Sequence, residues 1–360
     1  MINISSPLEL PALRLNDRLE HLLNQARAQE SRFIDLAPSR GLELWHLDKV
    51  CSYASGNKFF KQALYWLAAE THPELPLLSF GGAYSNHLYA LAAEAQRKKR
   101  NLIAVVRGLH EGPLNPCLRD LENMGASIQF VSRQDYRRKD DQDYLNELAQ
   151  QWGPFIHVPE GGGGLMGAFG AQAIGLAAAE KDIENIVLAV GTGSTAAGVL
   201  AGLDIACRRQ LLQGCRPSFK RLLLVPVIKL QRQPDQKNVL DEIQYLRSQL
   251  ADVNAERLGV DANVETSDWV QWECCEGFQF GGYGKFPPQL ARFLSSFESK
   301  FSVTLDPVYT AKAMAMACRF IAEEHYPDLP ELSSRNSAQH QRLLFIHSGG
   351  LQGRRGFGLL

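Results

Sequence analysis

The sequence predicts an α/β protein in which mostly parallel sheets carry helices on both faces. Strand-like and helix-like segments alternate along most of the 360 residues, as in sheets built from strand–helix–strand units. The strand-like segments are almost continuously apolar, which is typical of parallel strands buried on both faces. Four of them end in glycine-rich turns, at residues 81–82, 161–164, 191–193 and 349–350. Because ligands of such sheets bind at the carboxyl ends of strands, we expect these turns to line one cleft.

The elements follow in order from the apolar patterns. An amphipathic helix at residues 16–31 and a short strand at residues 42–46 precede an apolar helix at residues 59–69. Further helices are predicted over residues 87–99, 115–124, 134–152, 167–180, 194–210, 239–250 and 310–325, and further strands over residues 75–80, 101–107, 127–132, 155–159, 186–190, 221–227 and 343–347. We expect two domains: a smaller one, residues 62–165, inserted into a larger one formed by residues 1–61 and 166–360.

Composition narrows the class of protein. The net charge is −1 and the isoelectric point about 6.8, which disfavours a nucleic-acid partner or an anionic membrane surface. The basic run at residues 96–100 is interpreted as cations at a helix C-terminus. Seven cysteines without a Cys-x-x-Cys pair disfavour both a disulfide framework and a zinc site. With no basic-then-apolar leader and no apolar run of membrane length, we expect a cytoplasmic protein.

The stretch Gly56-Asn57-Lys58-Phe59-Phe60-Lys61 stands at the start of the helix predicted over residues 59–69. Lys58 and Lys61 are three positions apart, so their side chains project from the same side of the first turn. Cations are poorly placed at this positive end of a helix, unless an anion lies beside them. Two interpretations stay open at this point. The lysines mark a solvated helix start, or one lysine holds a carbonyl cofactor as a Schiff base and the other its phosphate.

A second stretch, residues 190–198, takes a strand through glycine and hydroxyl residues into a helix. Glycines allow backbone N–H groups to turn toward an anion, and Ser194 or Thr195 can donate hydroxyl hydrogen bonds. The pattern is not Gly-x-Gly-x-x-Gly, and the strand at residues 222–225 is not followed by an acidic residue. It is not a Walker loop either, because no lysine precedes Ser194. A single phosphate therefore fits better than a dinucleotide or a triphosphate.

Taken together, the motifs are similar to those of a known family. They are Gly56-Asn57-Lys58 with Lys61, Ser85-Asn86-His87, the run Gly191 to Thr195, Asp306-Pro307-Val308-Tyr309-Thr310, and His347-Ser348-Gly349-Gly350. The combination resembles the pyridoxal-phosphate enzymes of the tryptophan synthase β-like fold, also called fold type II. Within them it looks most like the group of D-cysteine desulfhydrase and 1-aminocyclopropane-1-carboxylate (ACC) deaminase. The resemblance covers residues 48–350.

The resemblance implies a role for each matching residue. Lys58 would hold pyridoxal 5'-phosphate covalently and move protons, with Ser85, Tyr283 and Tyr309 as the other catalytic residues. The cofactor's phosphate would lie near Lys61 and the cup formed by Gly191, Thr192, Gly193, Ser194 and Thr195. Asn86 would bind the cofactor's phenolic oxygen, and Thr310 would face its pyridine nitrogen. Ser85, Asn86, His87 and Ser348 would bind the substrate. The resemblance implies no metal; we also expect a homodimer.

Two positions discriminate between the activities of this group. Thr310 stands where the deaminases have glutamate, and a neutral hydroxyl makes the ring a weaker electron sink than a carboxylate does. Ser348 stands where deaminases have leucine and desulfhydrases have threonine. Both residues favour β-elimination from D-cysteine, which gives pyruvate, sulfide and ammonia. The alternative is ACC deamination to 2-oxobutyrate and ammonia. An alternative of another class is a non-catalytic cofactor- or ligand-binding protein, because residues 47–51, the pair Phe59-Phe60 and the residues after Gly350 depart from the family pattern.

Overall fold

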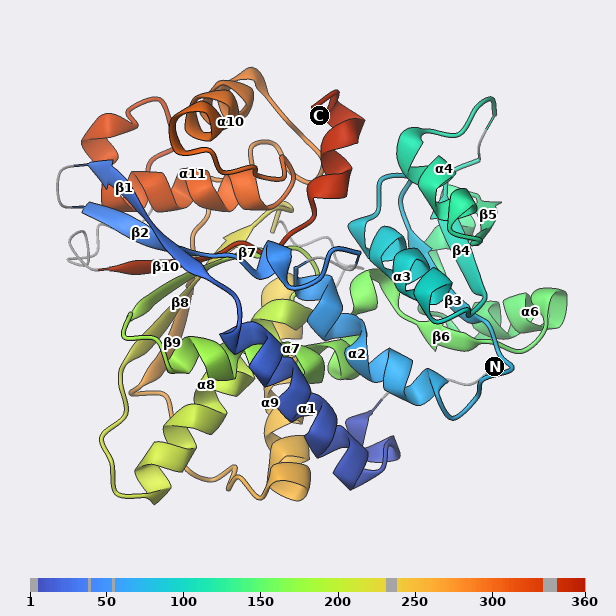
Figure 1. Cartoon of the computed structure of the whole chain (residues 1–360), viewed down its shortest axis with the longest axis horizontal. Coiled ribbons are helices and arrows are strands. Elements are labelled where there is room, and N and C mark those ends of the chain that lie inside the picture. The colour runs from blue at the N-terminus through green and yellow to red at the C-terminus, as the bar shows by residue number, and fades with distance from the viewer. Residues whose placement is uncertain are drawn as a thin grey trace.

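Two sheets organise the chain, as the computed structural model of residues 6–37, 40–53, 56–109, 111–230, 238–332 and 342–359 shows (Figure 1). The six-stranded sheet has the order β1 (Ser31–Ala37), β2 (Arg40–Trp45), β10 (Leu343–Ile346), β7 (Asn185–Val190), β8 (Lys220–Pro226) and β9 (Val270–Cys274). The four-stranded sheet has the order β5 (Ser127–Val131), β4 (Leu102–Arg107), β3 (Leu77–Gly81) and β6 (Ile156–Val158). All pairs are parallel except β1–β2, so the predicted α/β class is confirmed.

The six-stranded sheet is buried on both faces. Successive side chains of a strand point to opposite sides, so each strand contributes to two core clusters. In β7, Ile186 and Leu188 join the core cluster on one face, whereas Val187 joins the cluster on the other. The first face is covered by α1 (Ala12–Arg27), α2 (Asn57–Ala69), α7 (Gly164–Ala179), α8 (Ser194–Leu212) and α9 (Val239–Leu258). The second is covered by α10 (Pro288–Phe301) and α11 (Thr310–Ile321). This explains why the strand sequences are apolar throughout rather than alternating.

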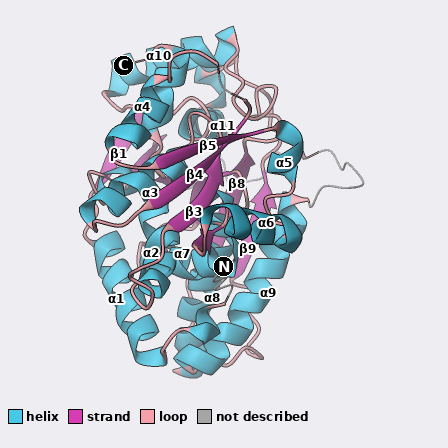
Figure 2. Cartoon of the chain, turned by 90° about the vertical axis from the view of Figure 1, so that its right-hand side faces the viewer, coloured by secondary structure: helices cyan, strands magenta, loops and turns pink. Residues whose placement is uncertain are grey.

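The four-stranded sheet repeats this arrangement on a smaller scale. Figure 2 shows α3 (Asn86–Arg97) and α4 (Pro116–Asn123) on one side, and α5 (Arg133–Arg137) and α6 (Gln142–Trp152) on the other. Leu78 and Phe80 of β3 pack with Tyr136 of α5 and Leu145 of α6, whereas Leu77 belongs to the core on the opposite face. The division into two domains, with boundaries near residues 62 and 165, remains a prediction.

Helices α7 and α8 cross at a contact that only glycine allows. A Cβ atom on Gly198 would lie 2.2 Å from the carbonyl oxygen of Ala168, and one on Gly175 would lie 2.0 Å from that of Val199. Both distances are far shorter than a van der Waals contact, so the two backbones touch directly. Both helices begin at glycine-rich turns, residues 161–164 and 191–193, and their close packing therefore fixes the distance between these turns.

Most predicted elements are present, with three differences. The helix predicted over residues 134–152 is two helices, because Asp141 caps α6 with its side chain and interrupts the run. The helix predicted over residues 16–31 ends at Arg27, and Ser31 already begins β1, which the prediction missed. The prediction also missed β9 and α10. β9 is an edge strand, half-buried along most of its length, so it lacks the continuous apolar run of its neighbours.

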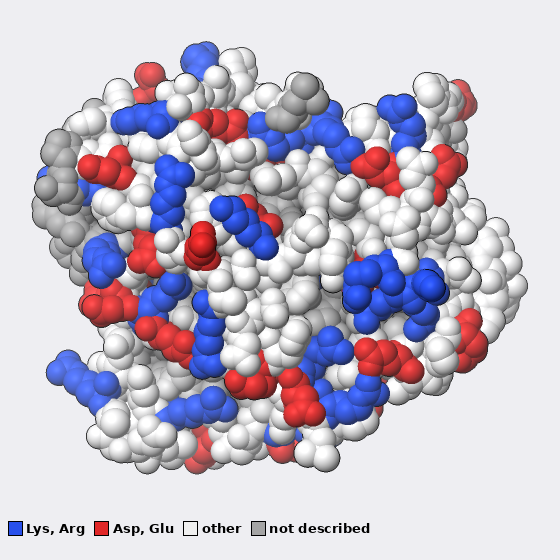
Figure 3. Space-filling view, in the orientation of Figure 1, with Lys and Arg blue, Asp and Glu red and all other residues white. Residues whose placement is uncertain are grey.

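The surface carries mixed charges and one concentrated basic group. Figure 3 shows acidic and basic side chains interspersed over the face in view, with basic ones gathered over the end of α3. The guanidinium of Arg100 donates to the carbonyl oxygens of Ala69, His72 and Leu75, and Arg97 pairs with Glu94. Arg100 thus satisfies carbonyls at the end of α2 and in the turn that follows it, and Arg97 lies in the last turn of α3, where the sequence analysis places cations. None of the helices in the described ranges is long and apolar enough to cross a membrane. The seven cysteines form no disulfides.

The contact between α7 and α8 generates a stability prediction. Replacing Gly198 by valine should lower the free energy of unfolding by about 2 kcal/mol or more, because the helices must separate to admit the side chain. Valine at the exposed position Gln210 of the same helix serves as the control and should change stability by only a few tenths of a kcal/mol. Urea unfolding followed by circular dichroism measures both variants. Equal stability of the two variants would contradict the close contact.

Candidate active site

Helix α2 begins against the turn that follows β10. Gly56 precedes the helix with φ +69°, and a Cβ there would lie 1.9 Å from the carbonyl oxygen of Ser348. The backbone N–H of Asn57 donates to the same oxygen at 3.1 Å. Glycine is therefore required both by the positive φ and by the close approach of the two chains. This contact sets the position of the first turn of α2, and so of both lysines that the sequence singled out.

Lys58 and Lys61 both reach the glycine-rich turn after β6. The amine of Lys58 donates to the carbonyl oxygen of Gly161 at 3.3 Å. A Cβ on Gly161 would lie 3.9 Å from the amine of Lys61, and a Cβ on Gly162 would lie 3.5 Å from the Cβ of Lys61. The wall beside the lysines thus consists of backbone, whose N–H groups can be used by a ligand. The predicted convergence of Lys58 and Lys61 on one side of α2 is present.

Desolvation lowers the pKa of both lysine amines. It lowers the pKa of Lys58 to about 8, and the charge of Glu160 acts in the opposite direction. It lowers the pKa of Lys61 well below the usual value, and the neighbouring charge of Lys58 lowers it further. Within the described ranges neither amine forms an ion pair with a carboxylate. Burying an unpaired cation is costly, so the geometry suits a ligand that brings negative charge.

The loop Gly191 to Thr195 approaches the same space from the end of β7. Gly193 has φ +87° and immediately precedes α8. The side-chain amide of Asn57 donates to the hydroxyl of Thr195 at 2.9 Å, which ties the loop to the start of α2. A Cβ on Gly161 would lie 3.6 Å from the methyl carbon of Thr192, so the two glycine-rich turns face each other. The structure brings together the lysines, the turn after β6 and the start of α8, where an anion is favoured.

Ser85, Asn86 and His87 form the first turn of α3, but their side chains face different partners. The hydroxyl of Ser85 caps the helix by accepting from the N–H of Leu88 at 3.2 Å. The Oδ1 atom of Asn86 accepts from the N–H of Gly353 at 3.2 Å, in the segment Leu351–Phe357 near the C-terminus. Because the backbone N–H groups of a first helical turn have no intrahelical acceptor, this turn remains suited to bind a carboxylate.

The His87 side chain belongs to a buried network rather than to the open part of the site. Ser79 donates to the carbonyl oxygen of Val158 at 2.7 Å, so its hydroxyl oxygen accepts from Nε2–H of His87, also at 2.7 Å. Nδ1 is then free to accept from the amide of Gln62 at 3.0 Å. Burial and the charges of Lys58 and Lys61 lower the pKa of His87 well below its usual value, consistent with this neutral ring. Any contact of His87 with a ligand would therefore use its backbone N–H.

Tyr283 and Tyr309 stand side by side, as the sequence predicted for two residues of one site. Their rings meet edge to face with centroids 6.1 Å apart, and Tyr283 is 54% exposed. A Cβ on Gly191 would lie 3.0 Å from the ring of Tyr309, so the pair adjoins the loop after β7. Desolvation of the hydroxyl groups raises the pKa of both phenols, although the Tyr283 residue as a whole is partly exposed, and each phenol keeps its proton at neutral pH. Protonated phenols next to an anion site can donate a hydrogen bond or a proton.

Thr310 holds the start of α11 together with Asp306. The Thr310 hydroxyl oxygen accepts from the N–H of Asp306 at 2.7 Å, and Oδ1 of Asp306 accepts from the N–H groups of Val308 and Tyr309. Burial raises the pKa of Asp306 to about 7, although these backbone donors oppose it. Its second oxygen, Oδ2, is buried and has no hydrogen-bond partner in the described structure. With a pKa near 7, the Asp306 carboxyl group can carry a proton on Oδ2. An ionised carboxylate would instead leave a buried oxygen without a hydrogen-bond partner, which is costly.

Three further residues border the site and were missed by the sequence analysis. The Tyr136 hydroxyl donates to Oε1 of Glu160 at 2.6 Å, and the guanidinium of Arg107 lies over the Tyr136 ring at 5.6 Å. Arg107 ends β4 and Glu160 follows β6, so both lie at carboxyl ends of strands, like the glycine-rich turns. That position in the sequence is the signal that could have identified Arg107 and Glu160; Tyr136 lies in α5 and has no such signal.

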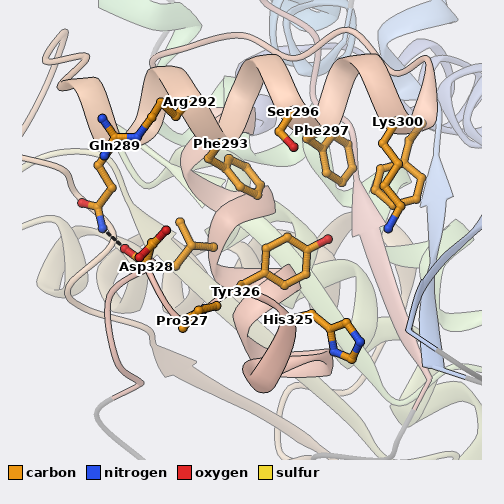
Figure 4. Close-up of a pocket in the computed structure, with 12 residues that line it drawn as sticks. Gln289, Arg292, Phe293, Ser296, Phe297, Lys300, His325, Tyr326, Pro327 and Asp328 are labelled. Atoms are coloured by element: carbon orange, nitrogen blue, oxygen red, sulfur yellow. Dashed lines mark hydrogen bonds between the residues drawn. The ribbon is translucent and has the colours of Figure 1, made fainter.

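One cavity of about 260 Å³ lies elsewhere, between α10 and residues 325–329. Figure 4 shows that aromatic rings of α10, Phe293 and Phe297, face Tyr326 across it. None of the sequence-predicted site residues lines this cavity. Within the described residues there is also no cluster of His, Cys, Asp and Glu side chains that could hold a metal ion. The sequence-predicted site residues therefore gather at the strand ends and not in this cavity.

The lowered pKa of Lys58 has a measurable consequence for the cofactor-free chain. Between pH 8 and the unfolded-state pKa of 10.5, the unfolded chain holds more proton on Lys58 than the folded chain does. Stability therefore rises with pH over this window, by at most about 1.4 kcal/mol per pH unit for one group. The Lys58→Met variant should lack this part of the rise, whereas the exposed Lys49→Met control should keep it. Urea unfolding at several pH values gives both slopes, and identical slopes would refute the lowered pKa.

The chain is similar to several known proteins. No family model matches the chain. A protein of Pyrococcus horikoshii named as a putative ACC deaminase is 27% identical over 291 residues, which cover 77% of this chain and 74% of that protein. One of Thermotoga maritima with the same name is 28% identical, covering 83% and 85%. A mitochondrial protein of Arabidopsis thaliana, named bifunctional D-cysteine desulfhydrase/ACC deaminase, is 24% identical, covering 87% and 73%.

The fold is shared with solved structures. A crystal structure of an ACC deaminase homologue superposes with a TM-score of 0.67 at 21% identity, covering 95% of this chain and 97% of that one. Escherichia coli diaminopropionate ammonia lyase gives a TM-score of 0.55 at 14% identity, covering 96% and 89%. The resemblance found in the sequence is thereby confirmed: the chain is related to proteins named ACC deaminase and D-cysteine desulfhydrase, and it has the tryptophan synthase β-like fold of type II pyridoxal-phosphate enzymes.

Proposed function

We propose that this chain is an enzyme that binds pyridoxal 5'-phosphate and eliminates a β-substituent from a small amino acid, with D-cysteine as the favoured substrate. The observation that carries the proposal is the pair of Lys61, which is buried, and Lys58, which is half-buried, beside two glycine-rich turns; in the described ranges neither amine forms an ion pair with a carboxylate. A phosphate ester with an attached aldehyde supplies what both lysines lack, an anion for one and an electrophile for the other.

The donors present fit such a cofactor. Lys61 and the loop Gly191 to Thr195 would hold the phosphate at the positive end of α8. Lys58, with a pKa of about 8, is partly unprotonated near neutral pH and can therefore attack an aldehyde. Asn86 accepts from Gly353 through Oδ1, which leaves its NH₂ group able to donate to a phenolic oxygen. Thr310 would lie near the pyridine nitrogen and would offer it a neutral hydroxyl.

In the proposed reaction each residue moves or holds a proton or orients the substrate. When bound, the cofactor supplies an electron sink for the substrate's α-carbon. The first turn of α3, Ser85 to His87, would bind the α-carboxylate through its backbone N–H groups, with Ser348 beside it. The Lys58 amine would remove the α-proton. Tyr283 or Tyr309, both protonated, would donate to the leaving group, and the released enamine would hydrolyse to a 2-oxo acid and ammonia.

The substrate assignment depends on Thr310 and Ser348. A hydroxyl in place of a carboxylate weakens the electron sink, which suffices to expel a stable thiolate but disfavours opening a cyclopropane ring. The names of the Pyrococcus and Thermotoga relatives instead favour ACC deamination, which is therefore the second candidate. A homodimer, a cytoplasmic location and the boundaries of the two domains belong to the same proposal.

The cofactor proposal predicts a spectroscopic result. Addition of pyridoxal 5'-phosphate to the purified chain should give a visible absorption band that dialysis does not remove. Borohydride reduction and peptide mapping should then find the pyridoxyl group on Lys58. Lys58→Ala should lose both signals and lose activity by at least about 1000-fold, whereas the exposed control Lys49→Ala should keep them. No band in the wild type would favour a non-catalytic protein.

The substrate proposal predicts which product appears. With D-cysteine the loaded enzyme should release pyruvate and sulfide in equal amounts, and with ACC it should release little or no 2-oxobutyrate. Replacing Thr310 by glutamate should shift the ratio of kcat/KM toward ACC, because a carboxylate strengthens the electron sink. Quantifying both 2-oxo acids as hydrazones separates the two activities. Release of 2-oxobutyrate alone by the wild type would overturn the desulfhydrase assignment in favour of the deaminase.

A further inference from the structure

Arg107 lies beside the turn that would bind the substrate's carboxylate. It is the last residue of β4 and is exposed. A Cβ on Gly82 would lie 3.9 Å from its Nη2 atom. Gly82 opens the turn that leads to Ser85 and the start of α3, so the guanidinium is next to the proposed carboxylate site without being part of it. Neither the motifs nor the comparisons assign a role to this residue.

The guanidinium is positioned without a counter-charge. It lies over the ring of Tyr136, with its central carbon 5.6 Å from the ring centroid. That ring is itself fixed, because the Tyr136 hydroxyl donates to Glu160, and Glu160 also approaches Lys139 at 3.6 Å. Within the described ranges no carboxylate forms an ion pair with Arg107. A planar cation held by stacking, with its N–H groups unpaired, is an arrangement suited to bind an anion.

Tyr283 lies in the loop between β9 and α10 and interacts electrostatically with Arg107. The positive charge of Arg107 lowers the pKa of the Tyr283 phenol, although burial raises it by more. Their charges therefore interact. Tyr283 also contacts Tyr309, which adjoins the loop after β7. A substituent that projects from the substrate's α-carbon past Gly82 would approach the guanidinium, and Tyr283 would be the phenol nearest to its charge.

We propose that Arg107 is a specificity-determining residue that binds a second negative charge on the substrate, and that the site accepts, besides D-cysteine, amino acids with an anionic β-substituent, such as a phosphate, sulfate or sulfonate. This inference rests on the proposed function, because it assigns a binding group to each anion of the cofactor and substrate proposed there. The cofactor's phosphate would use Lys61, and the α-carboxylate would use the first turn of α3. Arg107 is then a cation available for a third anionic group.

The same placement would assist the elimination itself. The α-proton passes to Lys58, a carbon–carbon double bond forms, and the bond from Cβ to the substituent breaks with its electron pair. The departing group therefore gains one unit of negative charge, which an adjacent guanidinium stabilises. Water then hydrolyses the released enamine to pyruvate and ammonia, so atoms and charge balance without an external oxidant or reductant.

The test compares two β-substituted alanines on the loaded enzyme, neutral β-chloroalanine and anionic O-phosphoserine, each as both enantiomers. Wild type should show the higher kcat/KM with O-phosphoserine. Arg107→Gln should lower the ratio of the two kcat/KM values by about tenfold or more, which is the worth of a charge-assisted hydrogen bond. Arg216→Gln is the matched control: this exposed arginine lies over Trp269 at 5.4 Å, on the loop before β8, at the amino end of a strand of the six-stranded sheet. Its ratio should equal that of the wild type.

A binding measurement keeps this inference separate from the proposed function. Titration calorimetry gives dissociation constants for two unreactive acids, the dianion succinate and the monoanion butyrate. Arg107→Gln should weaken succinate binding by about tenfold and should affect butyrate far less. If neither alanine derivative reacts but succinate binding depends on Arg107, the anion site stands and the elimination reaction fails. A ratio of kcat/KM or a succinate affinity that Arg107→Gln leaves unchanged would overturn the proposal.

Discussion

Two lysine amines enclosed by backbone form the constraint on which the rest of the site depends. Lys61 is 1% exposed, and the half-buried Lys58 donates to the carbonyl oxygen of Gly161. Bringing a charged amine out of water costs several kcal/mol unless an anion accompanies it, and both pKa values are lowered accordingly. A ligand with negative charge that binds beside the amines would offset this cost and raise the free energy of unfolding. A phosphate on an aldehyde-bearing ring meets both requirements at once.

The fold converts this local requirement into a site shared by both sheets. Gly56 is pressed against Ser348 after β10, while Lys58 and Lys61 reach the turn after β6. Helix α2 therefore links the carboxyl ends of strands from the two sheets. The segment Leu351–Phe357 adds a second link: Gly353 donates to Asn86 of α3, and Arg354 pairs with Glu298 of α10. In Figure 1 this segment runs between α10 and α11 on one side and α3 and α4 on the other, near the label of the C-terminus. A ligand at these strand ends would contact both parts of the protein.

The local features of the site could be predicted from the sequence, whereas the long-range ones could not. Lys58, Lys61 and the loop Gly191 to Thr195 are recognisable because their function depends on residues adjacent in the chain. The neutral His87, held by Ser79 and Gln62, depends on contacts between β3, α2 and α3, which no local pattern encodes. The group of Arg107, Tyr136 and Glu160 likewise assembles from three elements. For the fold, buried strands were visible as apolar runs, and the half-exposed edge strands β1 and β9 were not.

We expect a phosphate group to provide the missing negative charge beside Lys61. Equilibrium dialysis can measure this contribution from the dissociation constants of pyridoxal 5'-phosphate and of pyridoxal, which has the same ring and aldehyde but no phosphate. The phosphorylated form should bind at least about a hundredfold more tightly, as expected for several charge-assisted hydrogen bonds. Equal affinities for the two compounds would contradict this expectation, because the lysines and the loop Gly191 to Thr195 would then not be a phosphate site.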